Sequence, residues 1–286
     1  MTSLVRLRLD ISYDGADFAG WARQPEQRTV QGVVEDALAR IMRLDPPPVL
    51  TVAGRTDSGV HATGQVAHVV VPAPAYQQIS RAMSRRLAAV LPPDVRVREV
   101  ALAPEGFDAR FSALRRRYEY RVSDEPTGVA PLRRRDTVWH PRPLDVGRMN
   151  EASALLVGEH DFAAYCRKRE GATTIRRLLR YEWERREERL AVATVEADAF
   201  CHSMVRALVG AVLSVGDGRR PVEWPREVLL AGMRDSAVKV APAHGLILVE
   251  VVYPADHELA GRALETRRVR TLAQPALPVV PSPSAS

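Results

Sequence analysis

Hydrophobic and polar residues alternate over the first stretch of the chain, from Leu4 to Tyr13, with apolar side chains at every second position. This period of two predicts a strand with one buried face. From Thr29 to about Leu44 the apolar residues instead follow the i, i+3, i+4, i+7 spacing of a helix, which Thr29 can cap and the prolines at 46–48 end. The first hundred residues therefore predict the order β-α-β-β-α-β, with the remaining elements at 49–52, 65–71, 77–91 and 95–102.

The rest of the chain predicts a second group of strands and helices. A long strand is expected over 111–123, with Tyr118 and Tyr120 on one face and arginines on the other. Clean βαβ crossovers are few, which favours an α+β fold. We expect two α/β sandwich-like halves, each with a mostly antiparallel or mixed sheet and packed helices, around a central positively charged cleft. The other expected elements are helices at 144–157, 202–215 and 226–234, and strands at 174–186, 190–198 and 246–253.

The length of 286 residues predicts two domains. We expect an N-terminal α+β domain over 1–105, which carries an aspartate loop described below, and a C-terminal α+β domain over 106–254. Residues 255–286 are expected to form a disordered tail. The last part of this tail, 273–286, is rich in Pro, Ser, Ala and Val and carries no charge, so it lacks the apolar periodicity of a folded element.

Composition narrows the class of protein further. Only two cysteines occur, Cys166 and Cys201, which is typical of a protein from a reducing cytosol. No apolar stretch reaches the roughly 18 residues of a membrane span. The histidines and cysteines lack metal-ligand spacing, and no glycine-rich phosphate-binding motif occurs. We therefore expect a cytoplasmic protein with no metal, no cofactor and no membrane contact.

The chain is basic, with a net charge of +6 and a pI near 9.7, which suits a polyanionic partner. Nearly all of the basic residues are arginines, and codon bias alone can produce that skew. Basic residues also cluster, and each cluster taken alone is most simply a solvated face. Four clusters within about sixty residues nevertheless indicate a surface that follows phosphates. They lie at 115–117, 133–135, 167–169 and 176–177.

The segment Gly54-Arg55-Thr56-Asp57-Ser58-Gly59-Val60-His61 carries the strongest chemical signal. An aspartate between glycines is usually a turn former whose side chain bonds to the nearby backbone. Here Arg55 can help to hold a negative charge, and the glycines allow a ligand to approach the backbone closely. His61 and Gln65 add polar groups that a simple turn does not need. Asp57 is therefore a candidate catalytic carboxylate, and a turn former is the alternative.

Tyr118 and Arg206 are the other candidates for a site. An exposed Tyr118 would offer its ring as a stacking platform for a base, whereas a buried one would belong to an aromatic core. Arg206 lies at the edge of the apolar stripe of its predicted helix, with Gly210 one turn further on. It is either an ordinary boundary arginine or a partner that keeps a catalytic carboxylate charged and oriented. These residues by themselves define no reaction.

Further short segments in a fixed order extend from about Arg6 to Pro254. Together with the aspartate loop they resemble the tRNA pseudouridine synthase A family, which acts on the anticodon stem-loop. Two positions depart from the family pattern: Asp108 where histidine is expected, and Ala22 where glutamine is common. Both departures concern RNA contacts more than chemistry. The segments are Tyr13-Asp14-Gly15, Phe18-Ala19-Gly20-Trp21, Ala109-Arg110-Phe111-Ser112-Ala113, Arg117-Tyr118-Glu119-Tyr120, Gly158-Glu159-His160-Asp161-Phe162, Ala199-Phe200-Cys201-His202-Ser203-Met204-Val205-Arg206 and Gly245-Leu246.

The resemblance implies an isomerase that converts uridine to pseudouridine at positions 38, 39 and/or 40 of tRNA, without cofactor or metal. Asp57 then corresponds to the nucleophilic aspartate and Arg206 to its basic partner. Tyr118 corresponds to the tyrosine that stacks on the target uracil and is a candidate to take the proton from C5. Arg55 corresponds to the residue that fills the space left by the flipped base, and Leu246 to an apolar wall of the pocket. Whether Asp57 forms a covalent adduct or acts as a base is left open.

The resemblance also implies a homodimer, with tRNA lying across both subunits. Two alternative functions follow from the same residues. A non-catalytic RNA-binding or RNA-folding protein would use the arginine clusters and have no need of Asp57. A pseudouridine synthase acting on other RNA sites would keep the chemistry and change the substrate, and Asp108 and Ala22 are the sequence features that point toward it.

Overall fold

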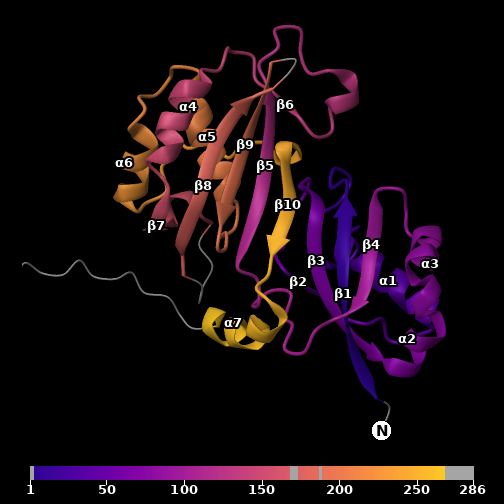
Figure 1. The fold of residues 1–286 in the computed structure, drawn as a ribbon. Coiled ribbons are helices and arrows are strands. Elements are labelled where there is room, and N and C mark those ends of the chain that lie inside the picture. The colour runs from indigo at the N-terminus through magenta and orange to yellow at the C-terminus, as the bar shows by residue number, and fades with distance from the viewer. Residues whose placement is uncertain (1–2, 168–172, 187–188, 268–286) are drawn as a thin grey trace, which may run out of the picture.

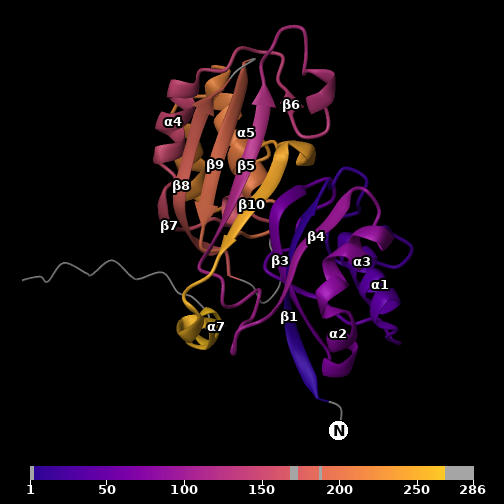
Figure 2. The ribbon, with the colours of Figure 1, turned by 45° about the vertical axis from the view of Figure 1, so that its right-hand side comes forward.

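In the computed structural model, which describes residues 3–167, 173–186 and 189–267, one sheet of ten strands joins the two halves of the molecule (Figure 1). Along its main path the strands follow the order β4-β1-β3-β10-β5-β9-β8-β7, while β2 pairs with β3 and β6 with β5. One group of helices lies beside β1, β3 and β4, and another lies beside β5, β8 and β9 (Figure 1, Figure 2). The predicted α+β class, with a mostly antiparallel mixed sheet, is confirmed.

The N-terminal half forms as its residue pattern requires. β1 (Leu4–Tyr13) pairs antiparallel with both neighbours, and its alternate side chains Leu7, Leu9 and Ile11 are fully buried. α1 begins after Thr29, whose hydroxyl accepts the Gly32 N–H at 3.3 Å and so satisfies one of the free donors of the first turn. The other elements of this half are α1 (Val30–Met42), β2 (Thr51–Val52), β3 (His61–Pro72), α2 (Ala73–Ile79), α3 (Met83–Val90) and β4 (Val95–Leu102).

The C-terminal half packs three helices beside its strands. In α5 (Met204–Gly216) every residue except Arg206 is buried, which is the pattern of a helix enclosed on all sides. On β5 (Arg115–Ser123) Tyr118 and Tyr120 share the buried face, as predicted. The other elements are β6 (Val138–Trp139), α4 (Val146–Ala154), β7 (Gly158–Asp161), β8 (Ile175–Arg185), β9 (Leu190–Ala197), α6 (Trp224–Ala231), β10 (Leu246–Val252) and α7 (Leu259–Thr266).

The two halves meet where β3 and β10 run parallel. Only two residue pairs make this contact, His61 with Ile247 and Ala62 with Leu248. The approach of the two backbones is close, because a Cβ on Gly64 would overlap the carbonyl group of Val249. β10 also pairs antiparallel with β5, and that pairing shifts register next to Val249. Glycine at position 64 therefore allows the sheet to continue from one half into the other.

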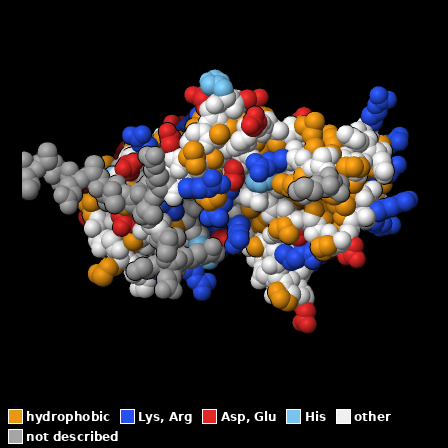
Figure 3. All heavy atoms as spheres, turned by 90° about the horizontal axis from the view of Figure 1, so that it is seen from below, with side chains coloured by type: hydrophobic (Ala, Val, Ile, Leu, Met, Phe, Trp, Pro, Cys, Tyr) orange, Lys and Arg blue, Asp and Glu red, His pale blue; other side chains and the backbone are white. Residues whose placement is uncertain are grey.

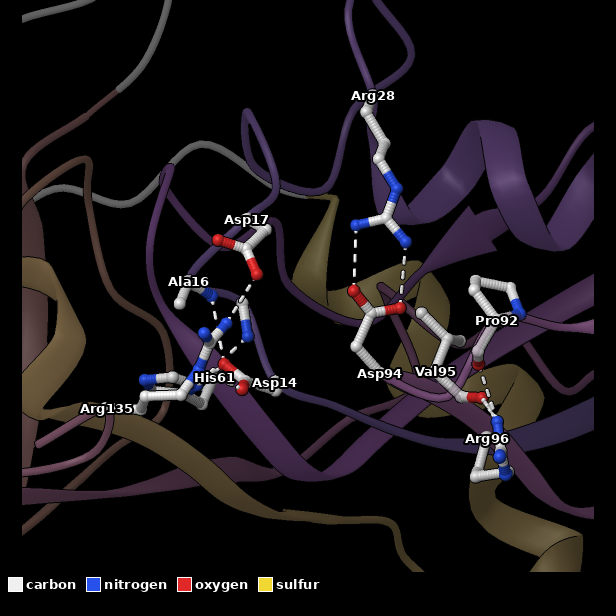
Figure 4. A network of polar contacts seen from close by, with 11 residues as sticks. Asp14, Ala16, Asp17, Arg28, His61, Pro92, Asp94, Val95, Arg96 and Arg135 are labelled. Carbon is white, nitrogen blue, oxygen red and sulfur yellow. Dashed lines mark hydrogen bonds and ion pairs between the residues drawn. The ribbon is translucent and has the colours of Figure 1, made fainter. Parts of the chain in front are cut away.

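Ion pairs cross the same junction on the outside of the sheet (Figure 4). Arg135, from the loop between β5 and β6, donates to Asp14 at 2.7 Å and to Asp17 at 2.5 Å, both just after β1. His61 lies behind them, where its Nδ1 accepts the Gly15 N–H at 3.0 Å and its Nε2 lies 3.1 Å from the His244 carbonyl oxygen. His61 is thus buried in the joint between the halves and does not face a ligand, contrary to the expectation from its place in the aspartate loop.

Three features differ from the sequence-based expectations. The helix expected at 77–91 is two helices, α2 and α3, separated by a short 3₁₀ turn at 80–82. β6 and β7 were not predicted, since they are two and four residues long and carry no clear period. The prediction of a disordered tail from residue 255 is wrong for 255–267, which contains α7, anchored by the buried Leu259 and Ala263. Residues 268–286 and the basic residues 168 and 169 lie outside the described part of the chain.

We expect Gly64→Ala to lower the free energy of unfolding by roughly 1–3 kcal/mol, because the added methyl group forces β3 and β10 apart. The matched control is Gly261→Ala in α7, where a Cβ meets no heavy atom within 4 Å and the change should be neutral or slightly stabilising. Urea unfolding of both variants measures the difference. Equal stability of the two variants would contradict the assigned role of Gly64.

Candidate active site

A pocket of about 1000 Å³ opens at the junction of the two halves. Its wall combines the aspartate loop, the start of α5, the start of β8 and the end of α7. Among the residues that the structure describes, seven arginines line it, against Asp57 as the single carboxylate. Seen from below, Lys and Arg side chains gather near the middle of the molecule (Figure 3). The lining arginines are Arg55, Arg110, Arg116, Arg167, Arg176, Arg206 and Arg267.

Buried hydrogen bonds to side chains of the core hold the aspartate loop in place. The Tyr13 hydroxyl lies 2.8 Å from Thr56 Oγ1, and Gln65 donates to the Tyr13 hydroxyl at 3.2 Å and to the Gly54 carbonyl at 2.8 Å. Burial raises the pKa of Tyr13 to about 12, so its hydroxyl keeps its proton for this network. Gln65 therefore orients the loop from within the core and does not add to the pocket wall.

A second set of contacts fixes the outer side of the loop. The Trp21 N–H donates to the Thr56 carbonyl at 3.1 Å, and the Ser58 hydroxyl donates to the Phe18 carbonyl at 3.1 Å. Gly59 has a φ of +78°, a conformation that residues with a Cβ rarely adopt. Held on both sides, the loop presents the Asp57 side chain to the pocket, a quarter exposed, instead of folding it back into the turn.

The Asp57 carboxylate contacts three side chains from the beginning of α5. Arg206 Nη1 lies 3.5 Å from Oδ2, and the Ser203 hydroxyl donates to the same oxygen at 3.3 Å. His202 Nε2 lies 3.2 Å from Oδ1. Asp57 and Arg206, 149 residues apart in sequence, are thus brought together as the sequence-based hypothesis required. The contacts of His202 and Ser203 were not predicted.

Arg206 is itself held in place by the chain that crosses α5. Its Nε donates to the Ala241 carbonyl at 2.7 Å, and its own carbonyl accepts the Ala241 N–H at 3.0 Å. Gly210 permits this crossing, because a Cβ there would overlap the carbonyl group of Lys239. The open helix edge at Gly210 therefore accommodates backbone of the same chain and not a ligand. The result is an arginine with one nitrogen committed to the fold and another directed at Asp57.

Tyr118 lies in the pocket wall but is largely buried, with 7% of its surface exposed. Its ring packs edge-on against Phe200, with 5.1 Å between the ring centroids. Burial raises the pKa of the Tyr118 phenol well above its usual range, and the nearby charge of Asp57 adds to this shift. Leu246 is buried and contributes an apolar part of the same wall. Tyr120, by contrast, lies outside the lining and donates to the Pro242 carbonyl at 3.0 Å.

Two arginines of the pocket lining have different environments: one is buried and binds backbone carbonyls, and the other is exposed. Arg116 is buried and donates to the carbonyls of Asp198, Ala53 and Arg110 at 2.6, 2.9 and 2.7 Å, so it joins the two halves beneath the pocket. Burial lowers the pKa of this guanidinium. Arg55 is exposed, and no ion pair involves it among the residues that the structure describes.

Carboxylates lie next to several arginines of two predicted clusters. Arg117 lies 3.2 Å from Glu250, Arg115 lies 3.4 Å from Glu196, and Arg135 is paired at the junction. Because carboxylates already neutralise these side chains, the clusters at 115–117 and 133–135 are only partly available to phosphates. Three of the pocket arginines, Arg116, Arg167 and Arg176, belong to the predicted clusters, and the other four come from elsewhere in the chain.

Asp108 and Ala22, the two departures from the family pattern, have structural roles. Asp108 accepts the backbone N–H groups of Arg110 and Phe111, each at 2.9 Å, and pairs with Arg267 at 3.1 Å. Its carboxylate therefore orders the turn and the end of α7, which together supply four of the pocket residues. Ala22 packs partly buried against the core, next to the pocket residue Trp21.

Cys166 and Cys201 are joined as a disulfide in the structure, with a Cα–Cα distance of 5.7 Å. The cysteine count alone did not predict this pairing. Within the described parts of the chain, no group of three or more His, Cys, Asp or Glu side chains is arranged to hold a metal ion. None of the helices described there is long and apolar enough to cross a membrane.

The pocket combines one carboxylate with an arginine, a tyrosine and a lining rich in arginines, which fits an enzyme that modifies RNA. Residues 152–254 match the family model described as tRNA pseudouridine synthase. Comparison over the whole chain is more specific. A relative from Frankia casuarinae named tRNA pseudouridine synthase A is 66% identical over 93% of this chain and 96% of its own length. One from Streptomyces griseus subsp. griseus with the same name is 61% identical over 94% of this chain and 95% of its own. The chain belongs to the tRNA pseudouridine synthase A family, a family of isomerases.

Among solved structures, a crystal structure of a Cbf5-Nop10-Gar1 complex matches with a TM-score of 0.31 and 11% sequence identity. The match covers 76% of this chain and 55% of that one. A likeness of this size does not bear on the site.

The burial of Tyr118 leads to a prediction at alkaline pH. The pKa of Tyr118 in the folded protein is raised above the ordinary value of 10.0. The tyrosinate absorbance of Tyr118 is measured as the difference between wild-type protein and Tyr118→Phe, and this difference should be zero at pH 10.0 and below. Below pH 10.0 Tyr118 keeps its proton in both the folded and the unfolded state, so its contribution to the unfolding free energy is complete. As the pH rises further this contribution is lost, because the tyrosine ionises first in the unfolded state. The unfolding free energy of wild type should therefore fall more steeply above pH 10.0 than that of Tyr118→Phe. A tyrosinate signal centred below that pH would contradict the prediction.

Proposed function

We propose that this protein converts uridine to pseudouridine at positions 38, 39 and/or 40 in the anticodon stem-loop of tRNA, with Asp57 as the reacting carboxylate. The observation that carries the proposal is the contact of Asp57 with Arg206, 3.5 Å apart, in a pocket that also contains Tyr118 and Leu246. Family membership supports the same substrate class, since the relatives are named for tRNA.

The substrate must leave the stacked stem before the reaction can occur. Extrusion of one nucleotide costs a few kcal/mol. A pocket of about 1000 Å³ has room for a nucleoside, and its arginines can bind the flanking phosphates. Arg55 is exposed and lines the pocket, which supports a role in filling the space that the extruded base leaves in the stem. These contacts offset part of the cost of extrusion.

The chemistry exchanges one glycosidic bond for another. The N1–C1′ bond breaks with the help of Asp57, the freed uracil rotates, and a C5–C1′ bond forms. The proton that leaves C5 is balanced by the proton that N1 gains, so no oxidant, reductant or metal is consumed. Arg206 and Ser203 hold the carboxylate toward the reacting carbon in a partly dry pocket, where fixed polar groups act most strongly. Asp57 acts either through a covalent adduct or as a base.

For Tyr118, the raised pKa supports stacking on the uracil more than removal of the C5 proton as a tyrosinate. A phenol that retains its proton at neutral pH is a weak base. Because the ring is largely buried, a base would stack on the part of it that borders the pocket. Its edge contact with Phe200 fixes the plane in which a base would stack. Leu246 encloses the same space from the side of β10.

The proposal includes a homodimer in the cytoplasm, with tRNA lying across both subunits. In a reducing cytosol Cys166 and Cys201 would be kept as thiols. Sedimentation of the purified protein with and without tRNA tests the dimer, and a monomer in both states would remove this part of the proposal.

Asp57→Ala and Asp57→Asn should lower pseudouridine formation by roughly a thousandfold or more, because the reacting group is lost. Binding of tRNA should persist, since either change removes a negative charge from an arginine-lined pocket. The matched control is Asp36→Asn, an exposed aspartate on α1 that pairs with Arg23. Chemical mapping of pseudouridine in tRNA transcripts, together with binding titrations, measures both effects.

The outcomes of this test separate the alternatives. Full activity in Asp57→Ala would refute the assigned chemistry. A wild-type protein that binds tRNA but forms no pseudouridine would indicate an RNA-binding protein. Modification of other RNA positions, with 38–40 left as uridine, would indicate a synthase with a different target.

Arg55→Ala should lower the rate of modification by roughly tenfold when the target uridine is paired in the stem, because the vacated space is no longer filled. The loss should be smaller on transcripts that carry a mismatch at the target, where extrusion costs less. Arg85→Ala on α3 removes an equal charge outside the pocket lining and is the control. An equal loss on paired and mismatched targets would show that Arg55 has a different role.

A further inference from the structure

The structure points to His202 as a positioning residue for the Asp57 carboxylate, a role that rests on the proposed function of this site. His202 directly precedes Ser203 and the first turn of α5, and its Nε2 lies 3.2 Å from Asp57 Oδ1. In the sequence, His202 follows Cys201 and no metal-ligand spacing marks it. Its position against the reacting group becomes visible only in the folded chain.

The two carboxylate oxygens have different partners. Arg206 and Ser203 both contact Oδ2, at 3.5 and 3.3 Å, and therefore act on the same oxygen. Oδ1 has His202 as its recorded side-chain partner. The terminal torsion of an aspartate is broad, so contacts to one oxygen leave the carboxylate plane free to turn. The His202 ring, with Nε2 3.2 Å from Oδ1, lies against the other oxygen and limits that freedom.

The backbone around His202 is built to hold this contact. The Arg167 N–H donates to the His202 carbonyl at 3.1 Å. The Met204 N–H closes the turn by donating to the Cys201 carbonyl at 3.1 Å. Ser203 has a φ of +63°, an uncommon conformation for a residue with a Cβ. This conformation directs two successive side chains, His202 and Ser203, toward the same carboxylate, and such outliers concentrate at functional sites.

A contact with tRNA phosphate is the other role open to a pocket histidine. His202 is about a quarter exposed, with 26% of its side chain accessible, and arginines already supply the cations of the pocket. Its Nε2 lies against the Asp57 carboxylate, whose negative charge disfavours a phosphate at the same nitrogen. Positioning changes the rate of the chemical step, whereas a phosphate contact changes the affinity for tRNA. Steady-state kinetics therefore distinguishes the two.

The test compares His202→Ala with His202→Gln, whose amide nitrogen can reach the place of Nε2. His202→Ala should lower kcat for pseudouridine formation by about ten- to a hundredfold, the effect of losing one polar contact with a charged group, with KM for tRNA unchanged. His202→Gln should recover most of the lost kcat. Thermal unfolding of both variants shows whether they are folded. An unchanged kcat in His202→Ala, a loss confined to KM, or no recovery in a folded His202→Gln would each overturn the inference.

A second measurement does not depend on enzymatic activity. In long-range ¹H–¹⁵N spectra of the imidazole groups, the signals of His202 are identified by their absence in His202→Gln. They should show a proton on Nε2, and Asp57→Ala should shift the Nε2 resonance. An unprotonated Nε2, or a resonance that Asp57→Ala leaves in place, would overturn the inference. If wild-type protein forms no pseudouridine while the Nε2 shift is present, the proposed function fails and the contact stands.

Discussion

The parallel pairing of β3 with β10 is the constraint on which the site depends. The two strands share only two residue pairs, yet their starts lie side by side. The aspartate loop directly precedes β3, and β10 pairs on its other edge with β5, opposite Tyr118 and Tyr120. Once this junction forms, Asp57 from one half necessarily faces the beginning of α5 and the ring of Tyr118 from the other. Gly64 makes the approach sterically possible.

Around this junction the arginines perform two different tasks. Arg116, buried beneath the pocket, donates to three carbonyl groups from both halves and so stabilises the backbone next to the aspartate loop. Arg206 divides its guanidinium between the Ala241 carbonyl and Asp57. A charged group with one end fixed by the backbone keeps its other end oriented without relying on the ligand, which is the preorganisation that electrostatic catalysis requires. Arg55 is exposed and is the kind of side chain that a polyanion can recruit.

Much of the fold could be read from local pattern. The alternation in Leu4–Tyr13 gave a strand with those bounds, and the spacing after Thr29 gave the capped helix α1. These features depend on contacts within a few residues, so the sequence expresses them directly. The aspartate loop and Arg206 were found for a similar reason, because unusual residues in short ordered segments are visible without knowledge of their partners. Short elements such as β6, and the break between α2 and α3, lacked such a signal.

The sequence by itself therefore determined the α+β class, the main elements, the family resemblance and the candidate residues Asp57, Tyr118 and Arg206. Tertiary structure alone decided which of the polar residues reach the pocket. His61 and Gln65 belong to the core, Arg116 is buried, and the end of α7 supplies Arg267 to the pocket wall. His202 and Ser203 meet Asp57 across a separation of more than 140 residues. Burial and pairing of this kind are set by strand order and backbone crossing, which are long-range contacts that no local period encodes.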